Sequence, residues 1–336
     1  MKNKLRNLFF LIGVVAVAVM LWKFEMPYDQ VLQNVRRAGI WFPAVLLLWG
    51  IIYFMNTCAW QVILNAGDTQ TQARVPFWKV YKYTVTGFSL NYVTPVGLLG
   101  GEPYRIMEVS AYVGKERATS SVILHAMMHI FSHFCFWAFS IVLYLLLYGE
   151  QMGWGMGIMM LLIAAFCVLG IYFFMKGYRN GLALNVLHFF ARIPFCRKKI
   201  NGFIERNLPA IERVDQQIAA LHAQSRRVFY LSLSLEFFAR IVGCLEILFI
   251  LYIMTDQVSF WDCILIQAFT SLFANLFFFM PMQMGAREGG FALATGGLAM
   301  TKAFGVYTSL IVRLREIVWI VIGIALMKVG NKIRKS

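Results

Sequence analysis

Two carboxylates follow a proline at the same spacing in two apolar parts of this sequence. Glu102 is the seventh residue after Pro95 in NYVTPVGLLGGEPYR, and Glu288 is the seventh after Pro281 in FFFMPMQMGAREGG. Helix-breaking prolines, flexible glycines and carboxylates are costly in hydrocarbon, and they persist mainly where backbone lines a polar cavity. The repeated motif therefore indicates a substrate site inside a membrane protein, as in transporters with broken helices.

The first copy predicts a break in the chain followed by a new helix. Pro95 interrupts the incoming segment, and Gly100 and Gly101 permit unusual backbone angles. Pro103 suits the first turn of a helix that would run from Tyr104 to Val113.

In the second copy, Pro281 and Gly285 are the breakers, and we expect a helix from about Ala286 to Gly296. A helix N-terminus carries unpaired amides and the positive end of the dipole, so it can receive an anionic group such as a phosphate. Two such ends would face one cavity near the middle of the membrane.

Glu102 and Glu288 each fall in the first turn of these helices, which leaves two interpretations open. They could cap amides and complement the dipole, as scaffold. Alternatively, a carboxylate in a low-dielectric cavity gains proton affinity and couples proton binding to substrate movement.

Arginines accompany both motifs. Arg105 lies three residues after Glu102, Arg287 directly precedes Glu288, and Arg313 lies in the last apolar stretch. Arginine suits bidentate contact with a phosphate. An unpaired arginine costs about 2.5–3.5 kcal/mol at a helix centre on insertion scales, so these side chains should face protein or water. We expect Arg287 and Arg313 to contact substrate.

Five further polar side chains lie within apolar helices. Glu236 and Arg240 are spaced four apart, and we interpret them as an ion pair within one helix. His125, His129 and His133 form one stripe on the helix predicted for 119–148. The outer two are about 12 Å apart at 1.5 Å per residue, so they cannot share one metal ion. A polar stripe lining the bundle interior is favoured, with proton relay as an alternative, and no metal is expected.

Composition places the elements that carry these residues in a membrane. The 336 residues are 60% hydrophobic and only 14% charged, well below the roughly 25% typical of soluble proteins. The net charge of +15 gathers at segment ends and in one loop, so nucleic acid is not an expected partner.

The lengths of the apolar stretches predict an all-α polytopic membrane protein. Six stretches are long enough to span a bilayer: 7–23, 42–64, 119–148, 154–176, 228–254 and 304–327. Two weaker regions, 78–114 and 261–300, hold the motifs and are predicted to be broken or re-entrant hairpins, although pairs of full-length helices are an alternative.

The positive-inside rule gives the orientation. The polar loop 177–227 carries nine lysines and arginines and is predicted to be cytoplasmic, as are both termini. The first motif region then starts and ends inside and the second starts and ends outside, which predicts an inverted repeat. The chain would be one domain, 1–336, with halves 1–176 (motif 91–105) and 228–336 (motif 281–288).

At these residues the chain resembles the family of lysylphosphatidylglycerol synthase transmembrane regions, which are flippase-like membrane domains. The resemblance covers essentially the whole chain. Its matching residues are Asn91, Pro95, Gly100, Gly101, Glu102 and Arg105 in the first half, and Pro281, Gly285, Ala286, Arg287 and Glu288 in the second. Relatives usually have Pro-Gly-Gly where this chain has Pro281-Met282-Gln283.

The resemblance implies an eight-helix-like flippase of the plasma (inner) membrane, without a cofactor, that moves an anionic or polyprenyl-linked lipid headgroup between leaflets. Glu102, Arg105, Arg287, Glu288 and Arg313 would bind the headgroup. Asn91 and the prolines and glycines of the motifs would shape the cavity. Bifunctional relatives carry a following aminoacyl-transfer domain, and since this sequence ends at Ser336 we expect no lysyl-lipid synthesis. Rival hypotheses are an integral enzyme acting on a lipid phosphate, and an accessory protein for a lipid or glycan enzyme.

Overall fold

The structure, a computed structural model, is helical throughout its described residues, in which no strand occurs. These residues are 6–11, 14–15, 33, 35–66, 74–93, 100–180, parts of 184–216, 226–255, 257–276, 286–298 and 302–329. Most of the predicted first span and of the loop 177–227 lies outside them, as do Pro95, Pro281 and Gly285.

The helices agree closely with the predicted spans. Their bounds are α3 Trp41–Asn65, α4 Phe77–Val93, α5 Gly101–Val113, α6 Lys115–Tyr148, α7 Trp154–Asn180, α10 Arg226–Leu251, α11 Phe260–Leu276, α12 Ala286–Gly297 and α13 Lys302–Leu326. Each motif region contains two short helices rather than full-length ones. The described helices of the two regions, α4–α5 and α11–α12, are 17, 13, 17 and 12 residues long.

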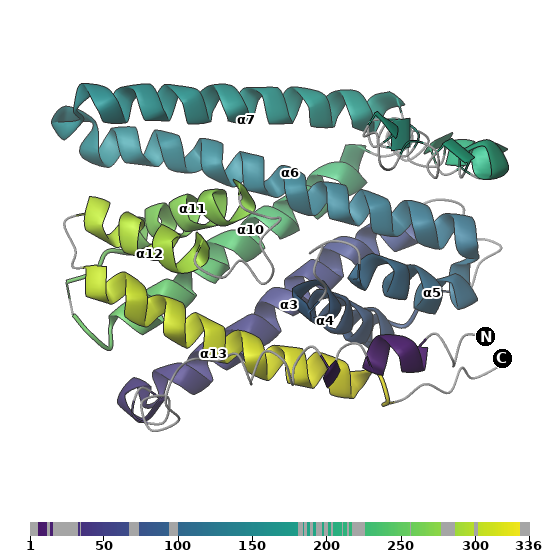
Figure 1. Ribbon diagram of the computed structural model, residues 1–336, viewed down its shortest axis with the longest axis horizontal. Helices are drawn as coiled ribbons and strands as arrows, with labels where there is room; N and C mark the ends of the chain where they lie inside the picture. The colour runs from purple at the N-terminus through teal and green to yellow at the C-terminus, as the bar shows by residue number, and fades with distance from the viewer. Residues whose placement is uncertain are drawn as a thin grey trace.

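The two hairpins lie at opposite ends of the bundle. In Figure 1, α4 and α5 occupy the right half of the molecule, and α11 and α12 the left half. Each hairpin packs against its neighbouring long helices and also against one from the other half of the chain, since α4 contacts α13 and α11 contacts α6. Neither half is therefore a separate packing unit.

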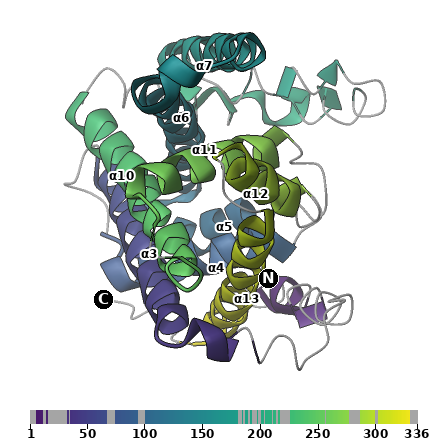
Figure 2. The same cartoon turned by 90° about the vertical axis from the view of Figure 1, so that its left-hand side faces the viewer.

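Helices α3 and α10 form the most extensive helix pair and lie side by side in Figure 2. Their contact joins the two halves of the chain along almost the full length of both helices. One buried apolar cluster gathers around α4 and α5, with members such as Leu90 and Tyr104. A larger one surrounds α11 and α12, with members such as Ile264 and Phe291.

By length and composition, three described helices are apolar enough to cross a membrane: α3, α6 and residues 154–176 of α7. Helix α7 packs mainly on α6 and leaves most of its surface exposed, as at Leu161 and Phe173 (Figure 1). In a membrane such a surface faces lipid. Helices α10 and α13 are also long, but they carry several charged residues within their spans.

Close backbone contact between α4 and α5 depends on glycine. A Cβ at Gly101 would lie 2.1 Å from the carbonyl oxygen of Gly87, and a Cβ at Gly87 would lie 2.2 Å from Nε of Arg105. Gly305 on α13 permits an equally close approach to the backbone of Phe291 on α12. Small residues at such crossings are the usual means by which membrane helices pack tightly.

We expect Gly101→Ala to destabilise the protein by about 1–3 kcal/mol, because the added methyl group overpacks the α4–α5 contact. The check is the melting temperature of the purified protein in detergent. Gly155→Ala on α7 is the matched control: nothing lies within 4 Å of a Cβ there, so its melting temperature should be unchanged or higher. Equal behaviour of the two variants would contradict the close contact.

Candidate functional site

Asn91, at the end of α4, holds the start of α5. Its Oδ1 accepts a hydrogen bond from the Gly101 amide at 2.8 Å, and its Nδ2 donates to Oε1 of Glu102 at 3.1 Å. The amide at the start of α5 is therefore capped by Asn91, and Gly100 at the N-cap makes no side-chain capping bond. Oε1 of Glu102 also lies 3.3 Å from Nη1 of Arg105, and Glu102 is in the first turn of α5, where a carboxylate complements the helix dipole.

Arg105 is buried among aromatic rings and backbone. It lies 3.3 Å from Glu102 and donates to the Thr84 carbonyl at 3.2 Å. Its guanidinium lies over Phe88 at 4.8 Å and Trp60 at 5.7 Å from the ring centroids. Stacking on aromatic faces and a carboxylate partner together offset the cost of burying the charge.

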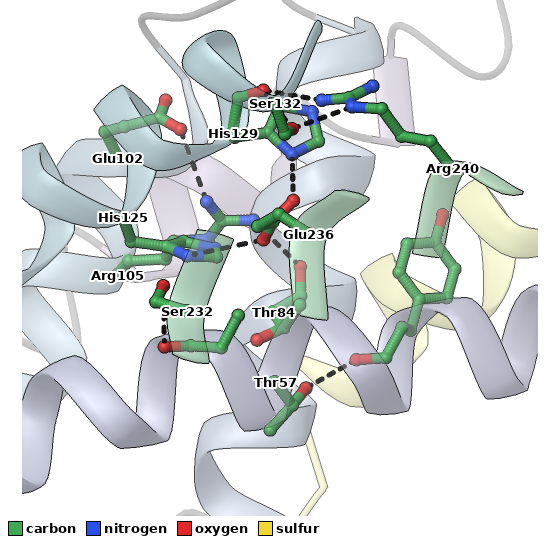
Figure 3. Close-up of polar contacts among 12 residues, drawn as sticks. Thr57, Thr84, Glu102, Arg105, His125, His129, Ser132, Ser232, Glu236 and Arg240 are labelled. Atoms are coloured by element: carbon green, nitrogen blue, oxygen red, sulfur yellow. Dashed lines mark hydrogen bonds and ion pairs between the residues drawn. The ribbon is translucent and has the colours of Figure 1, made fainter. Parts of the chain in front are cut away.

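The histidine stripe of α6 faces α10, where Glu236 lies between two of its members. Glu236 Oε2 is 2.8 Å from His129 Nδ1, and Oε1 is 3.6 Å from His125 Nδ1 (Figure 3). His125 also stacks on Trp60. We call the following residues the Arg105 cluster: Glu102, Arg105, His125, His129, His133, Glu236 and Arg240.

Arg240 completes this cluster. Its guanidinium bonds Ser132 at 2.7 Å, His133 at 2.9 Å and the His129 carbonyl at 2.5 Å. The prediction of a Glu236–Arg240 ion pair is wrong: both side chains reach across to α6 instead. Residues four apart share one face of a helix, so the spacing that permits an internal pair equally permits two contacts to a neighbouring helix.

A second group, called the Arg315 cluster, consists of Trp49, Glu246, Arg287, Arg315 and Glu316. Arg315 forms a bidentate pair with Glu246 at 2.8 and 3.1 Å. The indole of Trp49 donates to the same carboxylate at 2.9 Å and lies 3.7 Å below the guanidinium. Arg287 pairs with Glu316, which also lies 3.7 Å from Arg315.

Each cluster combines two arginines with two glutamates, so their formal charges balance. Helix α10 contributes to both, with Glu236 and Arg240 in one and Glu246 in the other. Ten residues separate the two glutamates, or about 15 Å along a helix. Helix α4 also touches both: Asn91 bonds Glu102, and Tyr92 lies within electrostatic range of Arg287 and Arg315.

The predicted site residues are thus distributed over two clusters. Glu102 and Arg105 belong to the first and Arg287 to the second. Arg313 lies on α13 with a partly exposed side chain, two residues before Arg315. Glu288 lies on α12, but its side chain is outside the described ones, as are Pro95, Pro281 and Gly285.

Sequence reasoning missed Arg315, Glu246 and Trp49. A signal existed for Arg315: it lies seven residues after Thr308 and four after Ile311, so it continues the buried i, i+3, i+7 pattern that starts at Thr308 on α13. The face of α13 that carries Thr308, Ile311 and Arg315 is buried in the bundle, whereas Arg313 lies on a different face and is partly exposed.

An apolar pocket of about 250 Å³ lies between α6, α7, α11 and α12. Three methionines of α7 line it, together with residues such as Phe269 and Leu293. A pocket of this character suits a hydrocarbon chain rather than a polar ligand. Within the described residues, no three His, Cys, Asp or Glu side chains are grouped so that they could hold a metal ion.

Comparison with known proteins gives one family. The family described as the lysylphosphatidylglycerol synthase TM region matches residues 10–324. No curated protein and no solved structure matches.

We expect Glu246→Leu to destabilise the protein by about 3–5 kcal/mol, because it leaves the buried Arg315 without its carboxylate. The double variant Glu246→Leu/Arg315→Met should lose less than the two single variants together, since no charge is then left unpaired. Thermal unfolding in detergent measures all three. Glu150→Leu, at an exposed acid, should change stability by no more than about 0.5 kcal/mol. Strict additivity would show that the pair is not coupled.

Proposed function

Because the chain belongs to the lysylphosphatidylglycerol synthase transmembrane-region family, we propose that it is a lipid flippase. It would move an anionic or polyprenyl-linked headgroup between the leaflets of the plasma (inner) membrane. A phosphate leaving water needs cationic partners inside the protein, and arginine offers them in bidentate geometry. We propose no chemical step on the lipid.

The observation that carries this proposal is a pair of buried arginine–glutamate clusters, each of which includes one arginine from a short helix of a motif region. Arg105 is the fifth residue of α5, and Arg287 is the second residue of α12. In the sequence, both helices begin within six residues after a motif proline, Pro95 or Pro281. The positive ends of two helix dipoles therefore add to the arginine charges, as in transporters that bind anions near the midplane.

We further propose an inverted repeat in which α3–α6 corresponds to α10–α13. Both units follow the order long, short, short, long, with lengths of 25, 17, 13 and 34 residues and 26, 17, 12 and 25 residues. The packing partners also exchange: α4 contacts α13, and α11 contacts α6. With the basic loop and both termini in the cytoplasm, one hairpin enters from each face.

Headgroup and acyl chains would use different parts of the protein. A phosphodiester that enters the Arg105 cluster would displace the Glu102 carboxylate from Arg105. The Glu102 side chain is partly exposed, at 18%. The apolar pocket beside α12 lies on the lipid-facing side of the bundle under α7, and it would hold part of an acyl chain. Rocking of one repeat against the other would then expose the headgroup to each leaflet in turn.

The test is lipid translocation in proteoliposomes that contain fluorescent phosphatidylglycerol, read by a quencher that cannot cross the membrane. We expect Arg105→Gln to slow translocation about tenfold or more, because it removes a charge-assisted hydrogen bond worth about 1.5–3 kcal/mol. Glu102→Gln and Glu288→Gln should abolish transport while folded protein remains in the vesicles.

Glu150→Gln is the matched control and should retain the wild-type rate, since that carboxylate is exposed and outside both clusters. Fluorescent phosphatidylcholine with the same acyl chains tests the need for an anionic headgroup. If phosphatidylglycerol, aminoacylated and polyprenyl-phosphate lipids all cross no faster than in protein-free vesicles, the flippase proposal fails. An accessory role beside a lipid or glycan enzyme would then be favoured.

A further inference from the structure

Two atoms that can share one proton face each other in the Arg105 cluster without a hydrogen bond. They are Nδ1 of His125 and Oε1 of Glu236, which are 3.6 Å apart, and neither has another hydrogen-bond partner. Both side chains are almost fully buried, at 2% and 1% exposure. An unsatisfied buried polar atom is costly, and here one added proton would satisfy both atoms together.

The second carboxylate oxygen connects this pair to an accessible group. Glu236 Oε2 lies 2.8 Å from His129 Nδ1, and the His129 side chain is 30% exposed. His129 also contacts Phe88, the ring that lies under Arg105. A proton can therefore reach buried Glu236 through His129, which lies next to it in Figure 3.

The charges around Glu236 decide what such a proton does. The titratable and charged groups that face this part of the cluster come from four helices: Tyr53 of α3, Glu102 and Arg105 of α5, His125, His129 and His133 of α6, and Arg240 of α10. With neutral histidines, two arginines balance two glutamates. One added proton therefore gives the cluster a net charge of +1.

We propose that His125, Glu236 and His129 form a proton-binding site, and that the proton bound there supplies the positive charge that an anionic lipid headgroup at Arg105 requires. The inference rests on the proposed function and adds its coupling ion. A singly charged phosphodiester and one proton enter the cluster together and leave its net charge at zero. The Arg315 cluster has no histidine among its residues, so the coupling belongs to the first cluster.

Thermodynamic linkage between proton binding and lipid binding sets the size and sign of the pH dependence of lipid affinity. If one proton binds with each lipid, affinity falls about tenfold for each pH unit above the range in which the site titrates. By reciprocity, lipid binding draws a proton from solution. Acid conditions therefore strengthen binding.

The experiment is calorimetric titration of the purified full chain in detergent with dihexanoyl phosphatidylglycerol, from about pH 5 to about pH 8, where histidine titrates. Repeating each titration in two buffers of different protonation enthalpy gives the number of protons taken up. We expect about one proton per bound lipid for the wild type. Glu236→Gln should bind the lipid with no proton uptake and with little dependence on pH, because the loss of one carboxylate leaves the cluster at +1 without a proton. His129→Asn keeps both carboxylates but lacks one group of the proton site, so it should take up less than one proton per lipid and bind the lipid more weakly at about pH 5.

His129→Asn keeps a side-chain nitrogen near the position of Nδ1 and lies at a partly exposed site, so it should fold even if Glu236→Gln does not. His188→Asn and Glu150→Gln, both at exposed positions, are the matched controls and should behave as wild type. Lipid binding without proton uptake in the wild type, or unchanged uptake in folded His129→Asn, would overturn the proton site while leaving the flippase proposal intact. Absence of lipid binding by the wild type would overturn both.

Discussion

The pairing of buried guanidinium groups with carboxylates is the constraint on which the rest of this structure depends. An isolated charge in a low-dielectric interior costs several kcal/mol, and removal of one partner leaves that cost uncompensated. For Arg315, this cost is offset by the ion pair with Glu246 and by contact with the face of Trp49. For Arg105, it is offset by Glu102 and by two aromatic rings. Helix positions throughout the bundle must keep these partners together, so the polar residues define the packing as much as the apolar ones do.

Helix α10 has the central place in this arrangement. It runs along α3, and its three charged side chains within the bundle serve both clusters. A displacement of one hairpin against the other therefore acts on α10 at two points about 15 Å apart along its axis. In the proposed flippase, a movement of α10 caused by headgroup binding at one cluster would therefore also affect the other cluster. The coupling would depend on hydrogen-bonded contacts rather than on apolar packing, which re-forms easily after a small shift.

Helix positions followed well from the sequence, but partnerships across helices did not. Apolar run length and the Pro and Gly breaks predicted α12 from about Ala286, where it begins. The chain-local spacing of Glu236 and Arg240 suggested a pair, yet both contact α6. Arg315 was missed because its importance depends on the rotation of α13, which decides that it, and not Arg313, faces Glu246. Rotation is set by tertiary packing, and a single sequence carries only a weak signal of it.

The crossing of the two halves has a consequence for biogenesis. Helix α4 emerges from the ribosome well before α13, on which it packs, and α6 emerges before α10, on which it packs. Until α10 arrives, His125 and His129 have no Glu236, and α4 lacks its long neighbour α13. Arg105, in contrast, already has Glu102 within its own helix, three residues away. The first hairpin thus carries its own counter-ion during insertion, while Arg315, near the end of the chain, enters a bundle in which Glu246 is already present.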